Sequence, residues 1–283
     1  MPELPEVETI RRRLARVLPG KKILQVEALH PKSFLGSEAQ LTGSTITDVD
    51  RRAKILRFKL DSDYSLLTHL KMTGQLIYVD KDQRLGGGHP TADWVQALPS
   101  RHTRITYQLS DQASLFFNDQ RIFGWMKLLP TEEADQLFTD MAPDINHQAV
   151  TVDYLQQALK RRTQSIKQAI MNNDIVCGVG NIYACDALNI AKISPHRPAN
   201  SLDKIELTTL LEAMQQVIKE GIDLGGTTFD GKYVDISGFA GGYQHKLRVY
   251  GREGEQCHQC GGTIVKEKLG GRGTYFCSMC QAT

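Results

Sequence analysis

The spacing of apolar residues divides the chain into a first helix, a block of short strands and a block of helices. Val7, Ile10, Leu14 and Val17 recur at the interval of a helical face, and Gly20 ends that pattern. The apolar positions then alternate or form short runs, which is typical of strands. We expect eight strands, at residues 22–29, 44–52, 55–60, 65–70, 74–79, 104–109, 114–118 and 124–129. Eight short strands with turn residues between them predict a β-sandwich.

The spacing becomes helical after Pro130. The expected helices cover residues 131–138, 151–161, 165–171, 182–188 and 202–221. Their expected N-caps are Thr151, Thr163 or Ser165, and Ser201. Two stretches interrupt the regular patterns: we interpret residues 80–100, with three consecutive glycines, as a long surface loop, and residues 221–242 as an irregular one.

Four cysteines near the C-terminus give the strongest local signal. Cys257-x2-Cys260 and Cys277-x2-Cys280 have the spacing of two knuckles around a tetrahedral four-sulfur Zn²⁺ site. Such a site has no open coordination position, so one structural zinc ion per chain would stabilise a tail too short to form its own core. A hairpin of residues 263–268 and 273–276 would join the knuckles. Unpaired thiols or two disulfides are the alternative.

Composition narrows the class of protein without identifying a partner. The 283 residues, 41% hydrophobic and 23% charged, are enough for two domains of an ordinary globular protein. A formal net charge of +2 is too small to indicate nucleic-acid binding, so any DNA-binding surface would be local. No apolar run is long enough for a membrane span and no signal peptide is recognisable, so we expect a protein of the reducing cytosol.

The first six residues hold a candidate nucleophile beside two carboxylates. A small second residue such as Pro2 usually permits removal of the initiator methionine, which would leave a free secondary amine. An α-amino group has a pKa of about 8, so a fraction is neutral at pH 7 and can form a Schiff base. Glu3 is adjacent and Glu6 lies one helical turn further on, where both could transfer protons. The simpler interpretation is that prolines and acids start a helix.

A glycine-rich turn, Gly178-Val179-Gly180-Asn181, lies between two expected helices. Glycines before a helix expose backbone N–H groups that can hold a phosphate, and Asn181 could cap the helix. A plain helix–helix turn is the alternative. The cations at 160–162 and Lys167 add positive charge nearby, although such a run is usually a solvated face.

Four stretches together resemble the bacterial formamidopyrimidine-DNA glycosylase family. They are MPELPEVETIRR, VCGVGNIYACDAL, LRVYGREGEQC and the cysteine cluster that ends in GTYFCSMCQ. The resemblance implies an α+β multidomain fold, with an N-terminal β-sandwich and flanking helices in residues 1–130, a helix–two-turns–helix domain in residues 131–245 and a zinc-finger β-hairpin in residues 246–283. It also implies a bifunctional DNA glycosylase/AP lyase that excises oxidised purines, such as 8-oxoguanine and formamidopyrimidines, and cuts the strand by β,δ-elimination.

The resemblance implies roles for single residues. Pro2 would attack C1′ of the damaged nucleotide, Glu3 would move protons during ring opening, and Glu6 would be a second acid near the site. Lys54 would contact the phosphate and lesion, and Arg272 would clamp phosphates around the lesion. The implied partner is double-stranded DNA that carries an oxidised base or an abasic site, bound by a monomer in the bacterial cytosol.

A base inside a duplex has to be flipped out before an amine can reach it, and the gap has to be filled. By resemblance the gap-filling residues are Met72, Arg121 and Phe123, although two of them would otherwise be assigned to the core. The implied DNA contacts are His69, Lys167, Asn181 and Tyr250, and the implied lesion loop contains Thr227, Thr228 and Tyr233.

The sequence departs from the family at three places. Ile122 stands where a cation is common, residues 80–100 form a longer loop than usual, and residues 229–233 differ from the usual continuation of the lesion loop. Ile122 in place of a cation would remove one contact with the DNA backbone, and the departure at residues 229–233 bears on the preferred lesion more than on the chemistry. Two other functions remain open: an endonuclease VIII-like glycosylase for oxidised pyrimidines, and a non-catalytic zinc-finger protein that binds damaged DNA. The Pro2-Glu3-Leu4 start favours the purine branch.

Overall fold

The computed structural model describes residues 2–89, 91–227 and 241–281, and these form two compact units. One unit combines Met1–Asp140 with Gly225–Gly241, and the other combines Met141–Leu224 with Gly242–Thr283. The division into three domains expected from the sequence stays a prediction. Within the described residues, no helix has the length and apolar character that crossing a membrane requires.

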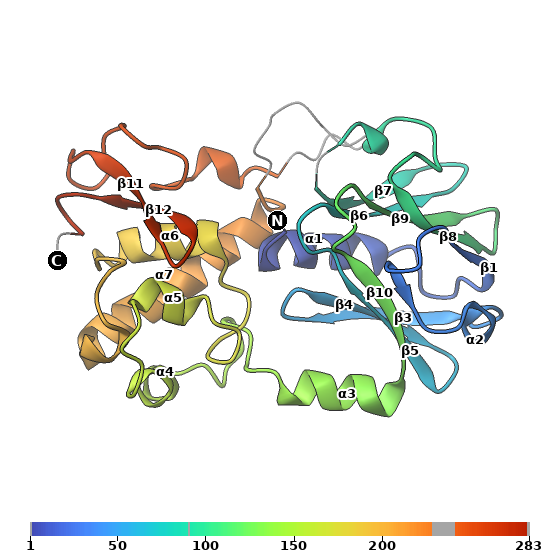
Figure 1. The fold of residues 1–283 in the computed structure, drawn as a ribbon, viewed down its shortest axis with the longest axis horizontal. Coiled ribbons are helices and arrows are strands. Elements are labelled where there is room, and N and C mark those ends of the chain that lie inside the picture. Colours follow the sequence, from blue (N-terminus) through green and yellow to red (C-terminus); the bar gives the residue numbers. More distant parts are fainter. Residues whose placement is uncertain (1, 90, 228–240, 282–283) are drawn as a thin grey trace. The chain divides into compact units, whose positions relative to one another are not determined.

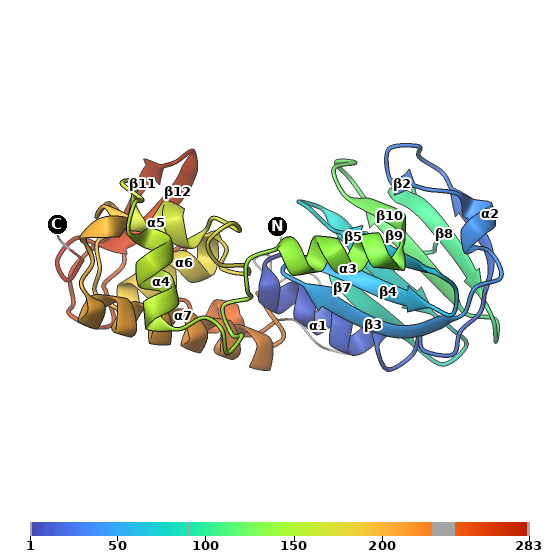
Figure 2. The same ribbon diagram turned by 90° about the horizontal axis from the view of Figure 1, so that it is seen from below.

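Two five-stranded sheets form the first unit (Figure 1, Figure 2). One sheet has the order β1 (Ile23–Ala28), β8 (Thr103–Leu109), β9 (Ser114–Asp119), β6 (Gly74–Val79) and β7 (Arg84–Gly88). The other has the order β2 (Phe34–Leu35), β10 (Trp125–Pro130), β5 (Tyr64–His69), β4 (Ile55–Leu60) and β3 (Ile46–Arg52). Paired strands are antiparallel except β10 and β2. Phe58, Leu76, Tyr107 and Phe117 are buried in one shared apolar core, so the expected β-sandwich is confirmed.

Among the described residues of this unit, three helices and one 3₁₀ turn accompany the sheets. α1 (Leu4–Leu14) packs against β7 of one sheet and β3 of the other, and it buries Val7, Ile10 and Leu14 in the shared core. The short α2 (Glu38–Leu41) lies beside β1, and α3 (Thr131–Asp140) lies beside β5 and β10. The position of α1 fixes the N-terminal residues at one edge of the sandwich.

The interpretation of residues 80–100 as a loop is wrong for its first part. β7 pairs with β6 from Val79↔Arg84 to Gln75↔Gly88, and the 3₁₀ turn η1 covers Ala92–Trp94. The glycines that suggested a break are needed for close packing, because a Cβ on Gly87 would collide with the Ile10 side chain of α1. A Cβ on Gly86 would collide with the Leu76 carbonyl of β6. Glycine inside a strand marks a close approach here rather than the end of the strand.

The second unit contains the helices α4 (Val152–Leu159), α5 (Ile166–Ile170), α6 (Asn181–Ile190) and α7 (Lys204–Asp223), and the hairpin β11 (Ile264–Leu269) and β12 (Arg272–Cys277). Two 3₁₀ turns, η2 (Ala199–Ser201) and η3 (Tyr243–His245), complete it. Thr151 and Ser165 cap α4 and α5 as expected, but Ser201 is not a cap. Asp203 caps α7 instead, and it forms a capping box with Glu206.

Candidate functional site

The start of α1 brings the two candidate acids together. Glu3 is the N-cap residue, only 3% exposed, and its backbone N–H donates to Glu6 Oε2 at 2.7 Å. Pro2 is buried beside it. Glu6 Oε1 accepts two hydrogen bonds from Thr227, from the backbone N–H at 2.8 Å and the hydroxyl at 3.0 Å. The helix-start interpretation is confirmed, and the catalytic interpretation of the same residues stays a prediction.

The register of the second sheet places three turns at one end. Ile55 and Trp125 both pair with His69, so Lys54, the turn after His69 and the turn before Trp125 lie at neighbouring strand ends. His69 Nδ1 accepts from the Lys71 N–H at 2.9 Å, and the ring centroids of His69 and Trp125 are 5.9 Å apart. Lys54, the segment from His69 to Met72, and Phe123 are distant from one another in sequence and lie together at one end of the second sheet.

The electrostatics of this edge keep His69 neutral at pH 7. Burial opposes its protonation, and the charges of Lys71 and Lys54 add to this effect, which lowers the pKa of His69 to about 4. The Nδ1 atom is already an acceptor, so the free proton of the neutral ring is on Nε2. His69 therefore offers a neutral N–H donor at Nε2 and carries no positive charge.

An ion cluster between α1 and β3 supports the turn that carries Lys54. Glu8 accepts from Arg11 and Arg12 at 2.8 Å, and its other oxygen accepts from Arg51 Nε at 2.8 Å. Burial opposes ionisation of Glu8, but these hydrogen bonds and charges outweigh it and lower its pKa to about 2. Arg51 Nη1 also donates to the Ala53 carbonyl, which precedes Lys54. Ala53 has φ 51°, a left-handed conformation that is uncommon without glycine.

The three expected gap-filling side chains lie on two exposed turns. Met72 is 37% exposed and Phe123 is 53% exposed, so the assignment of these two side chains to the core is wrong. The guanidinium carbon of Arg121 lies 4.7 Å from the centroid of the Phe123 ring, within the range of a cation–π contact. Ile122 between them has φ 57°.

In the second unit, Lys167 and Asn181 form one chain of hydrogen bonds with the zinc-finger hairpin. Lys167 Nζ donates to Asn181 Oδ1 at 2.5 Å, and Asn181 Nδ2 donates to the Gly273 carbonyl at 3.0 Å. Lys167 is only 1% exposed, so its interpretation as part of a solvated face is wrong. Asn181 is not the cap of α6 either; the N-cap residue is Gly180.

The hairpin presents Arg272 at an exposed tip. Gly270 and Gly271 have φ 58° and 76°, which lets β11 turn directly into Arg272 at the start of β12. Tyr250 packs on Tyr275 of the hairpin, with ring centroids 4.8 Å apart. Its backbone N–H donates to Asp186 Oδ1 at 3.2 Å.

The four cysteine sulfurs form a group that fits a zinc ion. Their Sγ atoms all lie within 4.8 Å of one another, with Cys260 and Cys277 3.4 Å apart and Cys257 and Cys280 3.9 Å apart. A tetrahedral site with Zn–S bonds of about 2.3 Å has S–S edges of about 3.8 Å. The expected structural zinc site is confirmed, and it ties both ends of the β11–β12 hairpin together.

The candidate residues divide between the two units. Pro2, Glu3, Glu6, Lys54, His69, Met72, Arg121, Phe123 and Thr227 belong to the first, and Lys167, Asn181, Tyr250, Arg272 and the four cysteines to the second. Thr228 and Tyr233 lie outside the described residues. Sequence reasoning missed the buried carboxylates Glu8, Asp119 and Asp186 that support these side chains. Asp119 had a local signal, since an Asp before a tight turn often accepts from the backbone that follows it.

Comparison with known proteins gives one consistent result. Models of the formamidopyrimidine-DNA glycosylase N-terminal domain, of its H2TH domain, and of a zinc finger found in FPG and IleRS match residues 1–126, 141–232 and 254–283. A formamidopyrimidine-DNA glycosylase of Pelotomaculum thermopropionicum is 40% identical over 288 residues, 99% of each chain. One from an Exiguobacterium species is 39% identical over 289 residues, again 99% of each.

Solved structures agree with the sequence relatives. A Lactococcus lactis FPG mutant in complex with Fapy-dG-containing DNA has a TM-score of 0.89 at 32% identity, with 100% of both chains covered. The L. lactis Fpg complex with abasic-site DNA has a TM-score of 0.88 at 32% identity and the same coverage. The expected fold class is confirmed by these matches. The chain therefore belongs to the formamidopyrimidine-DNA glycosylase family.

Proposed function

We propose that Pro2 is the nucleophile of this DNA glycosylase/AP lyase. The observation that carries the proposal is the arrangement at the start of α1, where Pro2 is buried beside the capping residue Glu3, and Glu3 is tied to Glu6. Removal of Met1 would convert the Pro2 nitrogen into a secondary amine with a pKa near about 8, poised between its neutral and charged forms at working pH. A carboxylate next to that amine can receive and return its proton.

The reaction then follows from the amine. As the Pro2 nitrogen bonds to C1′, the glycosidic bond breaks, and the base leaves with the bonding electron pair and takes up a proton from water. The nitrogen releases its own proton to Glu3. Protonation of the sugar ring oxygen by Glu3 opens the ring, and the C1′–nitrogen bond becomes an iminium. The iminium makes the C2′ proton acidic, so loss of that proton expels the 3′ phosphate. A second elimination expels the 5′ phosphate, and water releases the sugar fragment from Pro2.

The remaining site residues would bind the substrate. Lys54 and neutral His69 supply a cation and an N–H donor at one sheet edge, and Asn181 and Arg272 supply donors beside the hairpin. Phosphates are held in this way by proteins that act on DNA. Lys167 would act mainly by orienting Asn181, and Tyr250 would present its backbone and ring beside the hairpin. Met72, Arg121 and Phe123 would fill the gap left by the flipped nucleotide.

The proposed substrates are double-stranded DNA with formamidopyrimidines, 8-oxoguanine or abasic sites. Fapy-dG and abasic-site DNA are the ligands of the L. lactis complexes, and the curated relatives carry the name of the formamidopyrimidine activity. We place Thr227, Thr228 and Tyr233 in the loop that recognises the lesion. We also place the enzyme in the bacterial cytosol as a monomer, since its relatives are bacterial and its cysteines are thiols or zinc ligands.

Borohydride trapping tests the proposal. The duplex would carry Fapy-dG or an abasic site, and the reduced adduct would be mapped by peptide mass spectrometry. We expect the adduct on residue 2 of a chain that has lost Met1. A chain with an uncleavable N-terminal extension keeps every side chain but has no free imino group, so it should bind the duplex without forming an adduct. An adduct on Lys54, or cleavage by the extended chain at the normal rate, would contradict the assignment. Activity on oxidised thymine instead of Fapy-dG would favour the endonuclease VIII-like alternative.

A further inference from the structure

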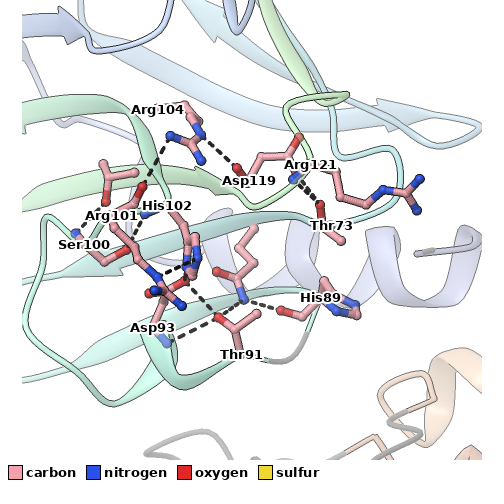
Figure 3. Close-up of polar contacts among 12 residues, drawn as sticks. Thr73, His89, Thr91, Asp93, Ser100, Arg101, His102, Arg104, Asp119 and Arg121 are labelled. Atoms are coloured by element: carbon pink, nitrogen blue, oxygen red, sulfur yellow. Dashed lines mark hydrogen bonds and ion pairs between the residues drawn. The ribbon is translucent and has the colours of Figure 1, made fainter.

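We propose that Asp119 is the positioning residue that holds Met72, Arg121 and Phe123 in place as one gap-filling unit. The inference rests on the proposed function, since it concerns how the enzyme fills the gap in the duplex. Asp119 ends β9, is completely buried, and touches neither the candidate nucleophile nor its acids among the contacts that the structure describes. Its carboxylate faces the backbone of the turn formed by residues 120–124, the gap-filling turn (Figure 3).

Three backbone N–H groups of the gap-filling turn converge on this one carboxylate. Oδ2 accepts from Phe123 at 2.9 Å and from Gly124 at 2.7 Å, and Oδ1 accepts from Arg121 at 3.1 Å. Gly124 has to be small, because a Cβ there would lie 3.0 Å from Asp119 Oδ2. The conformation held in this way includes Ile122 at φ 57°, where a β-branched residue is unfavourable without outside support.

Thr73 connects the same carboxylate to the turn that carries Met72. The Thr73 hydroxyl donates to Asp119 Oδ1 and accepts from the Arg121 N–H at 3.1 Å. Thr73 is buried, whereas its neighbour Met72 is exposed. The Thr73 hydroxyl and the Asp119 carboxylate therefore link the β5–β6 turn with the gap-filling turn. Both linking groups are buried, whereas Met72 and Phe123 on the two turns are exposed.

The backbone of Asp119 is fixed from the other side. Its N–H donates to the His102 carbonyl at 2.9 Å, and its own carbonyl accepts from Arg104 Nε at 2.8 Å (Figure 3). β9 also pairs with β6 at Asp119↔Gly74, directly after Thr73. The carboxylate is thus anchored in the sheet while it organises two turns outside the sheet.

Such an anchor matters for insertion into a duplex. Met72, Arg121 and Phe123 are mostly or partly exposed, so their side chains have little packing of their own to hold them. If the turn were mobile, ordering it would oppose insertion each time a nucleotide was flipped. Single-stranded DNA has no gap to fill, because the reactive sugar has no paired base opposite it. The anchor should therefore affect reactions on duplex DNA and leave reactions on single strands unchanged.

Asp119→Asn tests this difference. An amide has only one acceptor oxygen, so its NH₂ group must face either the Phe123 and Gly124 N–H groups or the Thr73–Arg121 pair. We expect kcat/KM for Fapy-dG excision from a duplex to fall at least tenfold. Cleavage of a single-stranded abasic oligonucleotide should stay within twofold of wild type. A 2-aminopurine placed opposite a stable abasic analogue should show a smaller fluorescence change on binding, because the gap-filling side chains insert beside it less completely.

Two controls separate positioning from general damage. Asp50→Asn removes another carboxylate of the same unit, one that pairs with Arg57 and Lys59, and it should lower the melting temperature without changing the duplex-to-single-strand ratio. Thr73→Val, which removes only the shared hydroxyl, should reproduce part of the duplex defect, and Thr73→Ser should restore it. If Asp119→Asn does not fold, the comparison of Thr73→Val with Thr73→Ser still tests whether this anchor positions the gap-filling side chains.

Equal losses on both substrates, or no loss on either, would overturn the inference. So would a normal duplex reaction in Thr73→Val. A different result would contradict the proposed function, namely that the wild-type chain forms no borohydride-trapped adduct on either substrate.

Discussion

Thr227 donates both its backbone N–H and its hydroxyl to a single oxygen of Glu6, across 221 positions of sequence. The other oxygen of Glu6 accepts from the N–H of Glu3. Gly226, at φ 87°, permits this approach, because a Cβ there would lie 2.9 Å from the Glu6 side chain. Glu6 therefore joins the start of the proposed lesion loop to the start of α1.

The hydroxyl of Thr227 supplies one of the two hydrogen bonds in this link. Thr227→Val removes the hydroxyl and keeps the backbone bond, so the loop loses one hydrogen bond to a charged group, worth about 1.5–3 kcal/mol. We expect excision of Fapy-dG to slow by roughly tenfold, since that range corresponds to about 10- to 150-fold and the backbone bond remains. Cleavage at an abasic site, where there is no base to recognise, should be unchanged. Thr227→Ser is the matched control and should behave as wild type.

The ion cluster at Glu8 should make the stability of the protein depend on pH. The pKa of Glu8 is lowered from 4.5 to about 2 on folding, so its contribution to stability is complete above pH 4.5 and is lost as the pH falls toward 2. At about 1.4 kcal/mol per pKa unit, the contribution is about 3 kcal/mol. Glu8→Gln should lower the free energy of unfolding in urea by about this amount at pH 7. The difference in the free energy of unfolding between Glu8→Gln and wild type should be smaller at pH 3.

An exposed glutamate supplies the comparison for that experiment. Glu27→Gln should change stability by less than about 0.5 kcal/mol at either pH, as surface substitutions usually do. A Glu8→Gln penalty that stayed constant from pH 7 to pH 3 would show that packing, and not the charge of Glu8, is responsible.

Asn181→Asp should separate DNA binding from stability. The new carboxylate would strengthen the bond from Lys167, where Asn181 Oδ1 now accepts at 2.5 Å, but it would lose the bond that Asn181 Nδ2 donates to the Gly273 carbonyl at 3.0 Å. These two effects on stability oppose each other, so the melting temperature should change by only about a few degrees. The carboxylate would also put a negative charge where the proposal places a phosphate. We expect DNA affinity at low salt to fall at least tenfold, with a smaller effect in high salt.

Asn172→Asp adds the same charge elsewhere in the second unit, where the side chain already accepts from the Asp174 N–H. It should leave affinity within about twofold of wild type, because the proposal places no phosphate at Asn172. If both variants weakened binding equally, net charge would explain the result and Asn181 would have no specific role.

The zinc site predicts a coupled loss of folding and binding. Elemental analysis should find one zinc ion per chain, and Cys257→Ser should reduce that content because a thiolate ligand is removed. We expect a lower melting temperature and weaker DNA binding together, since the hairpin that carries Arg272 is closed by the cysteine sulfurs. Normal binding by a zinc-free Cys257→Ser protein would contradict the structural role of the metal.

Local sequence signals located most elements but not the packing that holds the site. The alternation of apolar residues gave the eight expected strands their approximate positions, because each strand has a buried face. It missed β2, a strand of two residues, and it missed β7, where three glycines removed the apolar signal because α1 packs closely there. Lys167 looked like part of an exposed charge run, yet it is buried against Asn181, 14 positions away.

The sequence by itself determined most of the strands and helices, the zinc ligands and the family, because periodicity, cysteine spacing and short motifs are local properties. Only the tertiary structure decided which carboxylates support which side chains. Glu8 meets Arg51, Asp119 meets Thr73, and Glu6 meets Thr227 through contacts between residues 43 to 221 positions apart. No local pattern encodes such pairs, since they depend on sheet register and on the burial that makes each charge need a partner.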